Sequence, residues 1–130
     1  MKKKFASHGQ FKISLDGNIV IIEAEGPWNG EFFVNMHRSL AEQVGKLNTD
    51  NYALLVVLKG EAVATFDSIE VHNKYVRAGN TKAIAISLEC CETPSIAKAL
   101  FQRVYEENNL PHQFFSESAS AKEWVLKFID

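Results

Sequence analysis

The chain is poor in the residues that mark secreted or otherwise specialised proteins. It contains only two cysteines and three prolines in 130 residues. Because Cys90 and Cys91 are adjacent, they cannot link distant segments, and a disulfide-stabilised fold is not expected. Hydrophobic residues make up 46% of the chain and charged residues 23%. This composition is typical of a globular protein and excludes extensive disorder.

Long hydrophobic runs are also missing. The longest, residues 53–58, is far shorter than the roughly 20 residues that cross a bilayer, so no membrane span is expected. The lysines at the N-terminus are not followed by the apolar core of a secretory signal. We therefore expect a cytoplasmic protein whose cysteines are free thiols.

No strong excess of charge of either sign is present. The formal net charge is −2 and the isoelectric point is near 6.1, so nucleic acid is not expected as a partner. The one basic run, residues 2–4, falls in a segment expected to be a flexible tail, residues 1–8. A chain of this length predicts a single domain over residues 1–130.

What the sequence does contain is an alternation of short apolar runs with segments of helical periodicity. The expected strands cover residues 11–15, 19–24, 52–58, 82–88 and 113–115. The expected helices cover residues 31–47 and 68–78, a segment that opens with Thr93 as cap and Pro94 in its first turn, and a last segment capped by Ser118 or Ser120. Thr65 or Asp67 is expected to cap the second helix.

This order predicts an α/β domain with the succession β-β-α-β-α-β-α-β-α. Turn residues at 16–18 join the first two strands into a hairpin, which places one antiparallel strand at the sheet edge. The remaining strands alternate with helices, which predicts parallel pairing in a mostly parallel five-stranded sheet. Because the first strand leaves one edge unpaired, a homodimer is a further expectation.

The order of elements and one local motif resemble the SpoIIAA-like, or STAS-type, proteins, in particular their uncharacterised bacterial branch. Asp67 and Ser68 match the start of the Asp-Ser-Ser-Gly stretch of anti-sigma-factor antagonists, while Ile69 and Glu70 replace its second Ser and its Gly. The resemblance implies a SpoIIAA-like fold and a regulatory role switched by phosphorylation. With the second Ser absent, Ser68 and Thr65 are the candidate phosphorylation sites.

Topology also predicts where a site would lie. Ligands of parallel α/β sheets gather at the carboxyl ends of the strands, where helix N-termini favour anions. The loops there supply the candidate ligand-binding or partner-binding residues, which are Trp28, Lys59, Thr65, Asp67, Ser68, Cys90, Cys91 and Thr93. Trp28 either covers a pocket or packs over the core. The cysteines either have lowered pKa values at a helix N-terminus or serve as small buried hydrophobic residues.

Three functions remain open from the sequence. The first is a non-enzymatic regulatory module that binds another protein, favoured by the resemblance and by the lack of catalytic motifs. The second is a domain that binds a small apolar or anionic ligand or a lipid at the carboxyl ends of the strands, and an apolar cavity would favour it. An enzyme using Cys91 or Asp67 ranks last. No metal or cofactor is expected, because the His and Cys residues lack metal-ligand spacing.

Overall fold

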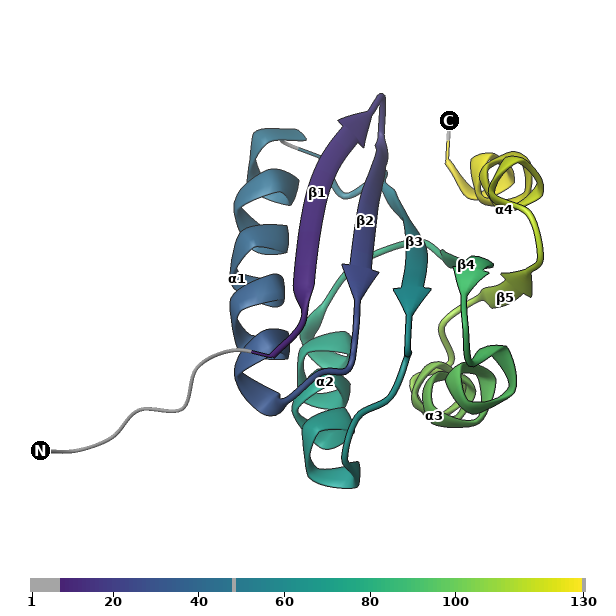
Figure 1. The fold of residues 1–130 in the computed structure, drawn as a ribbon. Coiled ribbons are helices and arrows are strands. Elements are labelled where there is room, and N and C mark those ends of the chain that lie inside the picture. Colours follow the sequence, from purple (N-terminus) through teal and green to yellow (C-terminus); the bar gives the residue numbers. More distant parts are fainter. Residues whose placement is uncertain (1–7, 48, 130) are drawn as a thin grey trace, which may run out of the picture.

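The computed structural model describes residues 8–47 and 49–129. Five strands and four α-helices alternate in the order expected from the sequence (Figure 1). The strands are β1 (Gln10–Asp16), β2 (Ile19–Glu25), β3 (Ala53–Gly60), β4 (Ile84–Cys91) and β5 (His112–Phe115). The helices are α1 (Gly30–Leu47), α2 (Phe66–Ala78), α3 (Pro94–Glu107) and α4 (Ser118–Val125), and a 3-10 turn (Leu126–Phe128) follows.

The expected hairpin opens the sheet. β1 and β2 pair antiparallel in a register that places Gln10 opposite Glu25 and Asp16 opposite Ile19. Gly17 takes a positive φ of 60° in the turn between them, a conformation that glycine adopts without the steric cost of a Cβ. The hairpin therefore gives the sheet its antiparallel edge strand.

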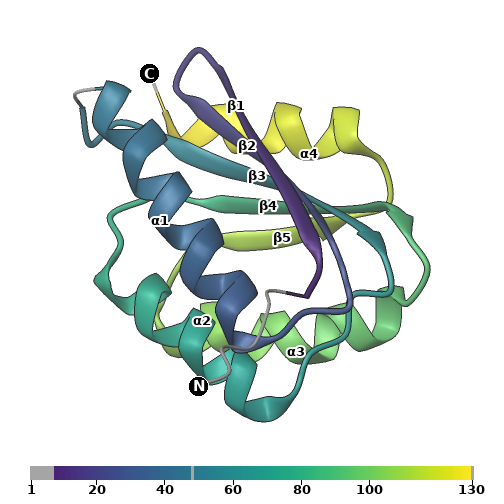
Figure 2. The ribbon, with the colours of Figure 1, turned by 60° about the vertical axis from the view of Figure 1, so that its left-hand side comes forward.

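The other strand pairs are parallel, and the strands lie in chain order from β1 to β5. Each parallel connection moves one place in the same direction, and crossovers of one hand then bring successive helices to the same face. Figure 2 shows α1, α2 and α3 together on that face and α4 on the other. The mostly parallel α/β prediction is confirmed.

The alternation of side chains along the strands makes a core on each face. On β2, Val20 and Ile22 point into the large core under α1, α2 and α3, while Ile19 belongs to a smaller core under α4. The small core is completed by Ala121 and Val125 of α4. This arrangement explains the continuous apolar run of β3, because residues of β3 belong to both cores.

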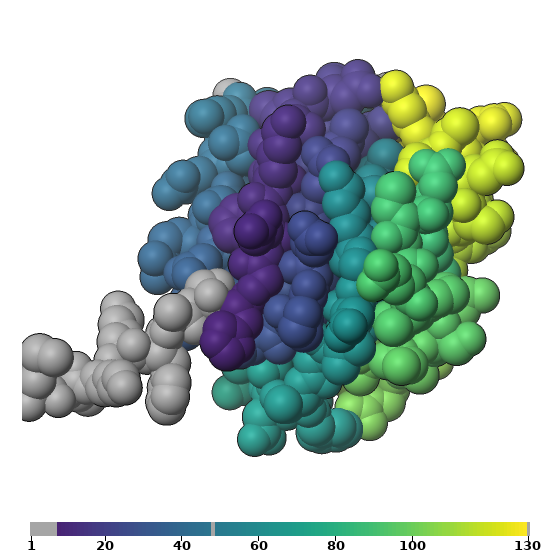
Figure 3. Space-filling view, in the orientation of Figure 1, coloured from purple at the N-terminus to yellow at the C-terminus, as the bar shows by residue number. Residues whose placement is uncertain are grey.

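Helix α4 covers only part of its face of the sheet. In Figure 3 the surfaces of β1, β2 and β3 lie side by side, and the yellow C-terminal segment covers only one end of them. The uncovered part carries polar side chains, including Lys12, Ser14 and the pair Glu23 and Lys59. This part of the sheet is therefore a polar surface.

Some local expectations change. The last helix begins at Ser118 with Glu117 as its N-cap residue, so neither Ser118 nor Ser120 is the cap. Strand β4 runs on to Cys91, which places both cysteines in the strand and not in a loop. Residues 1–7 of the expected tail lie outside the described residues, while the backbone N–H of His8 donates to Asn29 Oδ1 at 3.0 Å. No helix of the described segments is long and apolar enough to cross a membrane.

Candidate functional site

The loops at the carboxyl ends of β2, β3 and β4 come together as the topology predicts, and they bind one another. The backbone N–H of Trp28 donates to the Val63 carbonyl at 2.9 Å, and that of Glu92 donates to the Gly60 carbonyl at 2.8 Å. These hydrogen bonds extend the pairing of the strands into the loops. The loops at the carboxyl edge are therefore joined to one another by backbone hydrogen bonds.

Thr65 and Ser68 lie together at the start of α2. The Thr65 side chain caps the helix by accepting the Ser68 N–H at 3.2 Å, and the two hydroxyl oxygens are 2.8 Å apart. Thr65 is exposed, whereas the side chain of Ser68 is buried. Asp67 is exposed in the first turn, where its charge suits the helix dipole. Of the two candidate phosphorylation sites, only Thr65 is open to solvent.

Lys59 points to the opposite face of the sheet. Its ammonium lies 2.7 Å from Glu23 Oε1 on the uncovered polar surface. This hydrogen bond lowers the pKa of the Glu23 carboxyl and raises the pKa of Lys59. Because the pair is solvent-exposed, it contributes little to stability. Lys59 is thus separated from the residues of the α2 terminus.

The two cysteines end strand β4 and carry free thiols. Cys90 is exposed, which overturns its interpretation as a buried small hydrophobic residue, while Cys91 packs against the edge of the large core. Thr93 links the loops that follow β3 and β4, because its Oγ1 accepts a hydrogen bond from the Ala62 N–H at 2.9 Å. Nowhere in residues 8–47 and 49–129 do three His, Cys, Asp or Glu side chains gather as a metal site.

Trp28 packs inside the molecule. Its ring stacks on Phe32 at a centroid distance of 5.6 Å and meets the ring of Phe101 edge-on at 5.8 Å. Only 4% of the residue is exposed. Trp28 is also among the residues that line a cavity, and its buried Nε1–H has no hydrogen-bond partner among the described residues.

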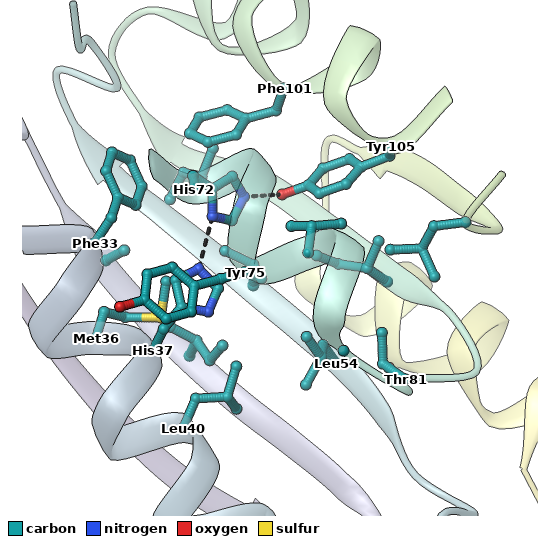
Figure 4. Close-up of a pocket in the computed structure, with 18 of the residues that line it drawn as sticks. Phe33, Met36, His37, Leu40, Leu54, His72, Tyr75, Thr81, Phe101 and Tyr105 are labelled. Carbon is teal, nitrogen blue, oxygen red and sulfur yellow. Dashed lines mark hydrogen bonds between the residues drawn. The ribbon is translucent and has the colours of Figure 1, made fainter. Parts of the chain in front are cut away.

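The cavity lies between the sheet and helices α1, α2 and α3, with a volume of about 90 Å³ (Figure 4). Its walls are apolar and aromatic, and they include Ile22, Met36 and Leu54. Leu40 of α1 and the exposed Tyr75 of α2 are also among its lining residues. No Asp, Glu, Lys or Arg lines it in the described part of the chain.

Three polar side chains form a hydrogen-bonded chain in this apolar space, which Figure 4 shows in dashed lines. His37 Nε2 of α1 lies 2.8 Å from His72 Nδ1 of α2. His72 Nε2 lies 3.1 Å from the hydroxyl of Tyr105 on α3. Three helices thus each contribute one member, and Tyr75 stacks on His37 with a centroid separation of 4.5 Å.

Burial keeps the side chains of His37, His72 and Tyr105 uncharged. Loss of hydration lowers the pKa of His37 to about 4 and lowers the pKa of His72 well below its ordinary value, helped there by the neighbouring His37. The same loss of hydration raises the pKa of the Tyr105 hydroxyl. Near neutral pH the cavity therefore presents hydrogen-bonding groups without a net charge.

Sequence reasoning missed this site. His37 and His72 are 35 positions apart and belong to no motif. A signal was nevertheless present, because His72 lies three residues after Ile69 and four before Val76, on the inward stripe of α2. Tyr105 likewise follows Phe101 by four residues on α3. A polar residue on an apolar stripe needs a buried partner, and each of these has one.

The fold and site together define a small α/β domain with an internal apolar cavity and a SpoIIAA-like arrangement of elements. The structure is similar to that of an uncharacterised DUF3478-family protein with a SpoIIAA-like fold from Shewanella loihica PV-4. The likeness has a TM-score of 0.64 at 13% sequence identity and covers 96% of this chain and 99% of the other. No family model and no curated protein matches the chain. The SpoIIAA-like fold is thus confirmed.

Proposed function

We propose that this SpoIIAA-like chain is a non-enzymatic binding domain that holds a small, mainly apolar molecule in the cavity between the sheet and helices α1, α2 and α3. The observation that carries the proposal is a cavity of about 90 Å³ with apolar walls and one hydrogen-bonded polar chain. Binding pockets combine apolar lining with a few convergent polar groups in this way.

The energetic cost of the cavity supports a use for it. Protein interiors are close-packed, and a void costs about 24 cal/mol per Å³. For a cavity of about 90 Å³ the cost is about 2 kcal/mol, a sizeable share of a domain's stability. An apolar cavity of about 150 Å³ in another protein binds benzene, so a guest of slightly smaller size is appropriate here.

The position differs from the one expected at the carboxyl ends of the strands. Hydrogen bonds join the loops at that edge, and the cavity lies instead between the sheet and helices α1, α2 and α3. The lack of charged lining residues in the described segments favours a neutral apolar ligand over the anionic one also considered from the sequence.

A cavity-filling variant tests the proposal. Ala24 is buried on β2 and lines the cavity, so Ala24→Val enlarges a cavity-lining side chain by two carbon atoms. We expect it to keep or raise the free energy of unfolding and to weaken the binding of small apolar probes at least tenfold. Binding is followed through the methyl resonances of Leu40 and Leu54 in NMR spectra.

The matched control is Ala85→Val on the other face of the sheet. Ala85 is fully buried in the small core under α4, away from the cavity. Overpacking there is expected to cost 1–3 kcal/mol, roughly, and to leave probe binding unchanged. Equal effects of both substitutions on stability, or a wild-type protein that binds no probe, would contradict the proposal.

One observation favours a second function, a regulatory module that binds another protein. Phe66 is 61% exposed next to the accessible Thr65, and Arg103 lies over its ring at 4.7 Å. An exposed aromatic residue with a cation beside it is a common interface anchor. A phosphate on Thr65 would add negative charge within one residue of this anchor.

Intact mass spectrometry of the protein from its native host tests this function. A phosphate mapped to Thr65, together with a protein partner that the Phe66→Ala variant no longer binds, is the expected result. An unmodified chain whose interactions are the same with and without the Phe66 ring would remove the second function and leave the first in place.

A further inference from the structure

The hydrogen-bonded chain of His37, His72 and Tyr105 has a direction. Tyr105 is buried, and among the described residues His72 Nε2 is the partner of its hydroxyl, at 3.1 Å. A hydroxyl proton left without an acceptor in the core costs about 1–3 kcal/mol. The Tyr105 O–H therefore donates and His72 Nε2 accepts.

The proton positions of the two histidines follow. A neutral imidazole carries one proton, so His72 with an accepting Nε2 has its proton on Nδ1. That N–H donates to His37 Nε2 across 2.8 Å. His37 Nε2 is then an acceptor, and its own proton lies on Nδ1. Every inner group of the three side chains then has a hydrogen-bond partner. The remaining donor is the Nδ1–H of His37, whose ring is partly exposed.

The surroundings of that donor contain no compensating charge. The cavity walls near it are Leu40, Met36 and the stacked ring of Tyr75. No Lys or Arg lines the cavity in the described segments, so a carboxylate or phosphate entering it would lose its hydration without gaining a counter-ion. An uncharged acceptor needs only one hydrogen bond.

We propose that the cavity selects a compact, electrically neutral molecule with an apolar body and one hydrogen-bond acceptor, such as a carbonyl oxygen, and that the His37 N–H binds this acceptor. The inference rests on the proposed binding function and adds the chemical class of the ligand. In this proposal His37 discriminates between ligands of equal size by whether they carry an acceptor, while the apolar walls provide most of the affinity.

Three probes of nearly equal shape test the inference. They are 2-butanone, which has a carbonyl acceptor, 2-methyl-1-butene, in which a methylene replaces the oxygen, and propanoate, which carries a charge. Each is titrated at pH 7 into the full chain, and Kd is taken from the methyl resonances of Leu40 and Leu54. The quantity compared is the ratio of ketone to alkene affinity, which cancels the contribution of the walls.

Two variants share the test. His37→Phe keeps an aromatic ring against Tyr75 and removes the donor, and the ketone-to-alkene ratio is expected to fall about tenfold. His112→Phe removes an imidazole that does not line the cavity and keeps the donor of His37, so the ratio is expected to stay within about twofold. Tyr105→Phe, which removes the terminal donor that sets the direction, should give an intermediate fall. Thermal unfolding of each variant checks that it is folded.

The results separate the inference from the proposed function. A ratio unchanged in His37→Phe, a ratio that falls in His112→Phe instead, or saturable propanoate binding to the same methyl groups would overturn the inference while the binding function stands. If the wild-type protein binds none of the three probes, the proposed function fails and the inference fails with it. A fall confined to His37→Phe and Tyr105→Phe would support both.

Discussion

At the scale of single residues, the buried histidines make stability depend on pH. The pKa of His37 is lowered to about 4 and that of His72 is lowered well below its ordinary value, whereas both are near 6.5 in the unfolded chain. Below pH 6.5 the unfolded state therefore binds protons that the folded state does not. The free energy of unfolding falls as pH decreases from about 6.5 to 4.

We expect each histidine to contribute a slope of up to about 1.4 kcal/mol per pH unit in this window. In the His37→Phe variant one of the two contributions is lost, so the decrease between pH 7 and pH 5 becomes smaller. Urea unfolding at pH 7, 6 and 5 measures this decrease in the free energy of unfolding. The titratable groups that contact the two histidines are Tyr75 and Tyr105. Tyr75→Phe is the control, and its free energy of unfolding should keep the full dependence on pH.

The cysteines provide a second residue-scale prediction. Cys90 is exposed and Cys91 packs against the core, so the two adjacent thiols should react at different rates with a thiol reagent. We expect one fast phase and one at least about tenfold slower. Cys90→Ser should remove the fast phase and Cys91→Ser the slow one. Two equal rates would show that the end of β4 opens readily.

At the scale of elements, Thr65 caps α2 and also bonds the buried hydroxyl of Ser68. Thr65→Ala removes both interactions and should lower the free energy of unfolding by about 1–2 kcal/mol. Thr65→Ser keeps the oxygen and should restore most of the loss. Chemical denaturation of the three proteins gives the comparison, and an alanine variant as stable as the wild type would show that the cap is dispensable.

The elements themselves were largely predictable from the sequence, whereas the site was not. Helix α1 follows from a stripe of apolar residues with a 3.6 period, and the hairpin follows from turn residues at 16–18. Periodicity describes one segment at a time. The contact of His37 with His72 depends on how α1 and α2 meet over the sheet, which no local pattern specifies.

At the carboxyl ends of the strands, by contrast, the sequence predicted a ligand site that the structure does not show there among its described residues. Topology brought the segments that follow β2, β3 and β4 together, and a ligand site was expected among them. Their backbone groups instead satisfy one another, as between Trp28 and Val63. Whether such loops leave an open site or close it depends on hydrogen bonds between segments far apart in the sequence.

At the scale of the whole molecule, α4 is the helix that covers the second face of the sheet within the described residues. Val125 is fully buried there against Leu55 and Ala85 of the small core. Val125→Ala should cost about 2 kcal/mol, because that core is too small to repack around the lost methyl groups. Leu126→Ala, next to it and 48% exposed, should cost under about 0.5 kcal/mol. Urea unfolding compares the two, and equal losses would contradict the role given to α4.

The single domain, the cytoplasmic location and the homodimer remain predictions of the sequence. For the dimer, the relevant surface is the outer edge of β1, which has no strand partner among the described residues. Light scattering across a range of protein concentrations measures the number of subunits directly.

The order of the strands has a consequence for synthesis on the ribosome. Every strand pairs with its neighbours in the chain, so each newly made strand finds its partner already present at the growing edge. No strand has to wait for a strand from a distant part of the chain before it can pair. We expect the sheet to assemble progressively from β1 to β5 as these strands emerge, with α4 covering the second face after β5 is in place.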